Sequence, residues 1–192
     1  MAEAEATATT GPRRRRRQSF AQRLEAARVV IGYTEADEAR VRATGTILAP
    51  SADAIAGSVY RYLLSHPETA AYFILPDGRP DRAHLEARQQ SLKAWLLSAI
   101  EAPLDERAAT YLAGIGLAHT RRGGHLPTGV KGRHLLATIS FVQTALIGLL
   151  DAAIADRAEL LATIDAWNKL LMIHLDLFLA VRGSAEGNPH WY

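Results

Sequence analysis

The spacing of residues in the last third of the sequence is the feature that most constrains its fold. Between residues 135 and 181, apolar residues and one histidine recur at alternating steps of four and three: Leu135, Ile139, Val142, Leu146 and Leu149, then Leu160, Ile164, Trp167, Leu171, His174, Phe178 and Val181. Such steps place each series on one face of an α-helix. No segment shows the alternation that is typical of a strand. The sequence therefore predicts an all-α fold that ends in two long helices.

Capping residues and prolines divide the preceding part of the chain into shorter predicted helices. Thr34 with Asp37 forms a capping box, and Asp81 is a suitable residue to open a helix. Prolines at positions 50, 67 and 103 interrupt the helical pattern. The predicted helices span about 20–31, 34–48, 51–65, 67–74 and 81–101, with Ser51 capping the third.

The segment from Leu104 to Gly124 predicts a further helix whose ends are marked on both sides. Acids suit its first turn and bases its last turn, and a pair of glycines suits a left-handed cap. These residues are Asp105, Glu106, Arg121, Arg122, Gly123 and Gly124.

His119 is the central residue of this segment. It lies at helical spacing from Leu112, Ile115 and Gly116, so its imidazole is expected to face the core one turn before the helix ends. A histidine on an apolar face is either a hydrogen-bonded core residue or a ligand. A neutral imidazole near a helix end is how globins hold haem iron, with the second ring N–H donated to a carbonyl or carboxylate.

Length and composition restrict the other kinds of site. The 192 residues suit one domain, and the absence of cysteine excludes disulfides, thiolate haem ligation, iron–sulfur clusters and cysteine-based zinc sites. We expect no membrane span, because no stretch approaches 18 consecutive apolar residues, and no signal peptide. A cytoplasmic location is therefore expected.

The positive charge of the chain belongs to its N-terminal tail. Setting aside Arg13 to Arg17, Glu3 and Glu5 leaves 17 of the 22 bases and 18 of the 20 acids, so the remaining chain is nearly neutral. A nucleic-acid-binding surface on the folded part is therefore not expected. The arginine run either makes weak contacts with RNA, DNA or acidic lipid or belongs to a disordered solubilising tail. We expect a disordered tail at 1–18, one domain at 19–183 and a C-terminal tail at 184–192.

Four motifs follow one another along the chain in an order that is typical of one family. They are SVYRYLLSHPETAAYFILPDGRP at 58–80, LKAW at 92–95, IGLAHTRR at 115–122 and DAWNKLLMIHLDLFL at 165–179. Together they resemble the protoglobin and globin-coupled sensor family over roughly residues 34–182. The resemblance implies a globin-like fold with an extra N-terminal helix and with haem between the E and F helices. Because the chain ends at Tyr192, we expect a globin domain without an output module.

The resemblance also implies roles for individual residues. His119 matches the proximal ligand of haem b iron, and Tyr60 matches the distal tyrosine, with Tyr62 as a competitor. Arg88 and Leu92 match distal positions of the E helix, with Ser91 as the alternative if the register slips by one. The remaining expected cofactor contacts are Phe73, Trp95, Leu112, Ile115, Arg133 and Ile139.

Two arginines and one histidine leave alternatives open. Arg88 departs from the family, whose members usually have an uncharged residue there; it can pair with a haem propionate, reach a bound ligand or point outward. Arg133 matches an arginine near the propionates, or is a solvated loop residue. If His174 held the iron instead of His119, the alignment would be wrong.

Three functions are consistent with these observations. The first is a haem b protein that binds O₂, CO or NO as a gas sensor or gas-binding globin, as a homodimer through its last two helices. The second is a haem enzyme with NO dioxygenase or peroxidase-like activity, assisted by Tyr60 and Arg88. The third is a helical dimerisation or adaptor module without a cofactor.

Overall fold

The computed structural model describes residues 18–124 and 129–185, so most of the predicted tails, His125 and His190 lie outside the described residues. The α-helices are α1 (Phe20–Ile31), α2 (Glu35–Ala43), α3 (Gly45–Leu48), α4 (Ala52–Leu64), α5 (Pro67–Ala70), α6 (Arg82–Glu101), α7 (Glu106–Ala118), α8 (Gly132–Ala153) and α9 (Arg157–Ala185). Two 3₁₀ turns, η1 (Ala49–Ser51) and η2 (Ala71–Phe73), join them. Extended pairing in the described ranges is limited to one bridge between Ile74 and Pro80. The all-α prediction is confirmed.

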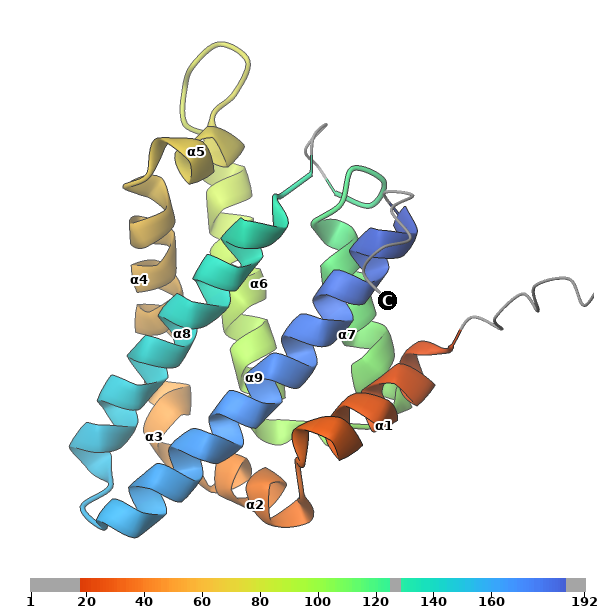
Figure 1. Ribbon diagram of the computed structural model, residues 1–192. Coiled ribbons are helices and arrows are strands. Elements are labelled where there is room, and N and C mark those ends of the chain that lie inside the picture. Colours follow the sequence, from red (N-terminus) through yellow and green to blue (C-terminus); the bar gives the residue numbers. More distant parts are fainter. Residues whose placement is uncertain (1–17, 125–128, 186–192) are drawn as a thin grey trace, which may run out of the picture.

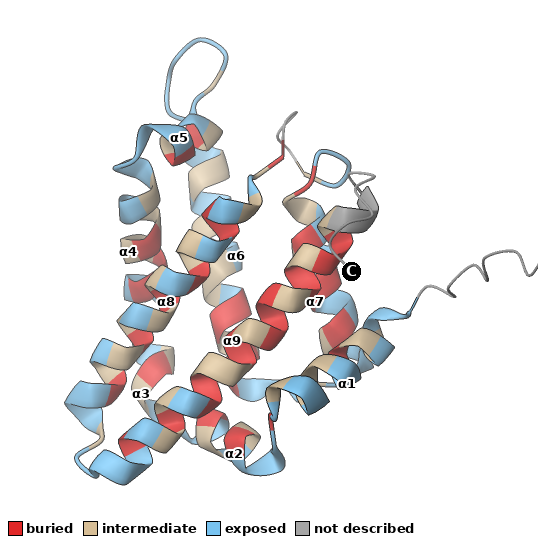
Figure 2. Ribbon diagram, in the orientation of Figure 1, coloured by how far each residue is buried: buried red, intermediate tan, exposed pale blue. Residues whose placement is uncertain are grey.

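The two long C-terminal helices form an antiparallel pair across the front of the molecule, as Figure 1 shows. Helices α6 and α7 lie behind this pair, α4 lies beside α8, and α1 runs next to α7 and α9. The buried residues follow the inward faces of these helices (Figure 2). Most of the predicted apolar positions are among them, including Ile139, Leu146, Trp167, Leu171 and Phe178.

One helix predicted near the N-terminus is in fact two. The capping box is present, because the Thr34 hydroxyl accepts from the Asp37 backbone N–H and the Asp37 carboxylate accepts from the Thr34 backbone N–H. The helix then ends at Ala43 and not near residue 48. The Thr44 hydroxyl donates to the Val41 carbonyl at 2.6 Å and accepts from Nε1 of Trp167 at 3.2 Å. These bonds hold the chain at the point where α2 gives way to α3.

The predicted role of Ser51 is also wrong. Its backbone is right-handed helical, with φ −94° and ψ −1°, and its side chain makes no capping hydrogen bond to α4. It belongs to the 3₁₀ turn η1 that precedes this helix.

The end of α7 differs from the prediction in a way that affects the candidate site. The helix stops at Ala118, and His119 is its C-cap residue and not a residue of its last turn. Gly123 and Gly124 are not left-handed, since neither has a positive φ. A Cβ at Gly123 would lie 2.5 Å from Cγ of Leu117, so this glycine permits close packing of the following turn against α7.

One described helix, α8, is long and apolar enough to cross a membrane, although the sequence led us to expect no such segment. This observation is weak support for a span, because core helices pass the same test. Its inward residues, such as Val142 and Leu146, are buried in the common core.

The close approach of α7 to α9 is expected to make Gly116 sensitive to substitution. A Cβ at Gly116 would lie 2.7 Å from the carbonyl oxygen and 2.9 Å from Cα of Phe178. Gly116→Ala should therefore lower the free energy of unfolding by about 1–3 kcal/mol in urea denaturation. Gly57→Ala is the matched control, since a Cβ added there would meet only the end of the Arg61 side chain, at 3.4 Å. It should stabilise the helix by about 0.5–1 kcal/mol, and equal effects of the two substitutions would contradict the packing argument.

Candidate functional site

A cavity of about 960 Å³ lies between α4, α6, α7 and the first half of α8. Its size is near the upper end of the range of about 300–1,000 Å³ for small-molecule pockets. Its wall is mainly apolar and aromatic, with a few polar groups. The described lining residues include Tyr60, Leu63, Tyr72, Phe73, His84, Arg88, Ser91, Leu92, Trp95, Ile115, His119, His134, Leu135, Ile139 and Phe178.

His119 lines this cavity, and the hydrogen bond of its ring defines which nitrogen is left for a ligand. Its Nδ1 lies 2.7 Å from the carbonyl oxygen of Ile115, one turn earlier. A carbonyl can only accept, so Nδ1 carries the hydrogen and donates, and Nε2 is the nitrogen with a free lone pair. Burial lowers the pKa of the imidazole, and the charges of Arg88 and Arg182 lower it further against the opposing hydrogen bond to Ile115. The ring is therefore neutral at neutral pH, as a metal ligand must be.

The backbone of His119 is held as firmly as its ring. Its carbonyl oxygen accepts from the backbone N–H of Val130 at 2.8 Å and from Arg182 at 3.3 Å. Arg182 also donates to the carbonyl of Val130. The end of α7 is thereby joined to the chain that leads into α8 and to the last helix, α9.

Tyr60 reaches the cavity from α4. Its ring meets Phe73 edge to face, with the centroids 5.6 Å apart. Burial raises the pKa of Tyr60 to about 12, although the nearby charge of Arg88 acts in the opposite direction. The phenol therefore keeps its proton and can serve as a hydrogen-bond donor. Its competitor Tyr62 is 39% exposed and stacks on Phe141, outside the lining.

Most of the residues that the sequence singled out come together at this cavity. The described wall contains His119 and, of the expected cofactor contacts, Tyr60, Phe73, Arg88, Ser91, Leu92, Trp95, Ile115 and Ile139. Leu112 lies elsewhere, in the core, where it borders a separate cavity of about 10 Å³. Arg133 lies outside the lining, on the surface beside Glu68.

His174 points away from the large cavity. It is buried, and Nε1 of Trp95 donates to its Nδ1 at 3.1 Å. Burial lowers the pKa of His174 to about 3, so it is a neutral core residue. The histidines that share the cavity with His119 are instead His84 and His134.

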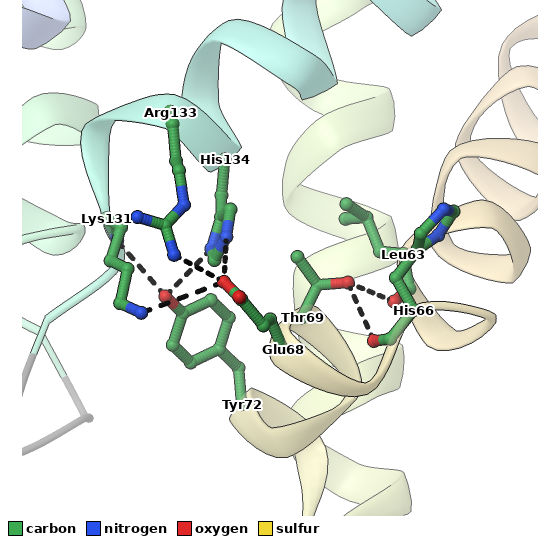
Figure 3. A network of polar contacts seen from close by, with 8 residues as sticks. All are labelled: Leu63, His66, Glu68, Thr69, Tyr72, Lys131, Arg133 and His134. Carbon is green, nitrogen blue, oxygen red and sulfur yellow. Dashed lines mark hydrogen bonds and ion pairs between the residues drawn. The ribbon is translucent and has the colours of Figure 1, made fainter.

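His134 and Tyr72 belong to a polar network at the edge of the cavity, shown in Figure 3. The Tyr72 hydroxyl lies 2.9 Å from Nδ1 of His134 and accepts from the backbone N–H of Lys131 at 3.1 Å. The exposed carboxylate of Glu68 pairs with Arg133 at 2.5 Å, with His134 at 3.3 Å and with Lys131 at 3.7 Å. The network joins α5 and η2 to the start of α8. Tyr72 and His134 are next in the chain to Phe73 and Arg133, which the sequence analysis had singled out. This adjacency is the signal in the sequence that pointed to the network.

A metal at this site would need a cofactor to complete its coordination. No group of three or more potential His, Cys, Asp or Glu ligands is found in the ranges 18–124 and 129–185. His119 alone supplies one nitrogen. That donor, at one wall of a large apolar cavity, fits a planar metal complex that brings its own equatorial ligands.

The family model described as Protoglobin matches residues 20–187 of this sequence. The chain belongs to the protoglobin family. Membership implies haem binding and gas sensing in general. A search of curated proteins found no match.

Solved structures show that this protoglobin has the fold of globin sensor domains. The globin domain of the Geobacter sulfurreducens globin-coupled sensor is 21% identical, with a TM-score of 0.70 over 82% of this chain and 96% of that chain. The ferric globin domain of E. coli DosC is 10% identical, with a TM-score of 0.62 over 82% of this chain and 98% of that one. The expected globin-like architecture is therefore confirmed.

Proposed function

We propose that this protoglobin binds haem b in the 960 Å³ cavity and uses it to bind O₂, CO or NO, as a gas sensor or gas-binding globin. The observation that carries the proposal is the orientation of His119, whose Nδ1 is bound to Ile115 and whose Nε2 is left for a metal. Haem would supply an iron with one open position for a diatomic gas. The protein's residues would then hold the iron, exclude water and supply a hydrogen-bond donor.

The three histidines of the cavity are not equivalent as iron ligands. Both ring nitrogens of His134 have partners, Tyr72 on one side and Glu68 on the other. His84 comes from the first turn of α6 and its ring lies beside Phe73, with the centroids 5.5 Å apart. His119 combines a neutral ring, a fixed orientation and a free nitrogen, which is the arrangement typical of a metal-ligating histidine.

Removing the His119 ring should abolish stable haem binding. Loss of a hydrogen-bond partner of a metal ligand typically weakens metal binding about 10–100-fold. His119→Gly removes the ligand itself, so we expect a larger loss of haem affinity. Added imidazole should restore binding, because it replaces the missing ligand without altering the fold. Haem dissociation to a scavenger protein measures this effect.

The matched controls for this experiment are His84→Gln and His134→Gln, which alter the other histidines of the cavity. Both variants should keep haem. If His119→Gly holds haem as tightly as the wild type, or if one of the controls loses it instead, the assignment of the proximal ligand is wrong.

Tyr60 is proposed to donate a hydrogen bond toward the gas. The phenol keeps its proton, and it lies in a largely apolar wall with Leu92 and Phe73. Bound O₂ carries partial negative charge and gains from such a donor in a dry pocket, whereas CO gains less.

The Tyr60→Phe variant should therefore release O₂ about tenfold faster, which corresponds to the loss of one hydrogen bond of about 1.4 kcal/mol. Stopped-flow displacement of O₂ by CO gives this rate. The control is Tyr62→Phe, whose ring stacks on Phe141 outside the cavity. Unchanged O₂ release in Tyr60→Phe, or an equal change in the control, would remove Tyr60 from this role.

We also propose that two copies associate through α8 and α9. Residues 134–150 of α8 contain no Asp, Glu, Lys or Arg. Its exposed positions recur every four residues, at Leu136, Ser140, Thr144 and Gly148, and form an uncharged outward stripe. Leu161 near the start of α9 is also 52% exposed. Such a surface on a helix pair suits a four-helix interface between two copies.

A charge placed on this stripe should prevent association. Thr144→Glu is expected to convert a dimer into a monomer in sedimentation velocity. Thr110→Glu is a matched control, because both residues are exposed and donate from their hydroxyl to the carbonyl four residues earlier. A monomeric wild type, or a Thr144→Glu variant that still dimerises, would contradict the proposed interface.

A further inference from the structure

Arg88 places a cation inside the candidate haem cavity. It projects from the middle of α6 and lines the cavity together with Leu92 and Trp95 on the same helix. Its Nε is buried and has no hydrogen-bond partner among the described residues. A buried N–H of a charged guanidinium without a partner is unfavourable, so this half-buried side chain is suited to meet an anion.

No carboxylate lines the cavity beside Arg88 in the part of the chain that the structure describes. The described lining of the cavity holds no Asp or Glu, and Arg88 is its one Lys or Arg side chain. The other titratable groups of that lining are tyrosines and histidines, which do not supply a carboxylate: Tyr60, Tyr72, Tyr111, His84, His119 and His134. The cavity wall that the structure describes therefore has a net positive charge.

Two anions can satisfy this guanidinium: a haem propionate, or a small anion at the open position of the iron. Burial has the larger effect on the pKa of both Tyr60 and His119, but the positive charge of Arg88 acts on each of them in the lowering direction. Geometry agrees with this, because Tyr60, Arg88 and His119 all line the same cavity. At the edge, by contrast, Lys131 and Arg133 gather around Glu68 (Figure 3) and are placed for carboxylates that face solvent.

We propose that Arg88 makes the interior of this pocket a binding site for small monovalent anions, such as azide, nitrite or fluoride, in addition to neutral gases. The inference rests on the proposed haem function, because the anion would occupy the open position of ferric iron. The guanidinium donates N–H groups to the anion and compensates its charge, whereas a neutral ligand such as CO gains little from it.

Azide titration of the ferric, haem-loaded protein tests this proposal. Arg88→Leu should weaken azide binding about 10–100-fold, as expected for the loss of a charge-assisted hydrogen bond. Arg88→Lys should recover part of the affinity, because it keeps the charge but not the fork of donors. Arg82→Leu, an exposed arginine at the start of the same helix, is the matched control and should leave azide binding unchanged.

Two further measurements separate the interior site from a propionate contact. The C–O stretching frequency of the ferrous CO complex reports the local electric field, and it should rise in Arg88→Leu if the guanidinium faces the ligand. The rate of haem loss should stay close to that of the wild type. Faster haem loss with unchanged azide affinity and an unchanged C–O frequency would assign Arg88 to a propionate and overturn the proposal.

The outcome for the wild type keeps this inference distinct from the function on which it rests. A wild-type protein that binds no haem would reject the proposed function itself. A wild-type protein that binds haem and CO, but whose azide affinity is the same in Arg88→Leu, would reject the anion site alone.

Discussion

The position of His119 depends on the close packing of α7 against α9. Gly116 allows the backbone of α7 to approach that of Phe178, and Arg182, one turn later on α9, donates to the His119 carbonyl. The ring itself is fixed by the carbonyl of Ile115. The imidazole is therefore oriented by backbone contacts and needs no carboxylate partner. This arrangement leaves a neutral nitrogen at the cavity wall, which is what iron in a porphyrin requires of a protein.

The polar groups of the cavity are few, and they are separated by position. The interior holds Tyr60, kept protonated by burial, and the guanidinium of Arg88. The edge holds the network around Glu68, which joins α5 to the start of α8. The rest of the wall that the structure describes is mainly apolar and aromatic, and polar groups act more strongly in such surroundings than in water. The neutral donor and the cation then favour different ligands, which is the basis of the selectivity that we propose.

Local signals in the sequence predicted much of this fold because a helix start is decided within one turn. The Thr34–Asp37 box, Asp81 and Asp105 all open helices as expected. The failures depended on distant residues. Trp167, far along the chain, bonds to Thr44 where α2 ends, and this contact forms only in the folded protein.

The candidate site was predictable to the extent that helical faces determine it. The apolar face of residues 104–124 indicated that His119 points inward, and the family resemblance added Tyr60 and the α6 positions. His84, His134 and Tyr72 were not among the residues predicted for the site from the sequence, because η2, α6 and α8 meet only in the folded chain. His174 is the opposite case. It also lies on an apolar helical face, but its ring bonds to Trp95 and is not part of the described cavity lining.

The most direct test of the account is the visible spectrum of the ferrous, haem-reconstituted protein before and after addition of CO. If His119 holds haem with an open position opposite, a Soret band appears with one haem per chain and shifts when CO binds. A protein that takes up no haem, or a Soret band that CO leaves unchanged, would contradict the central claim that this cavity is a gas-binding haem site.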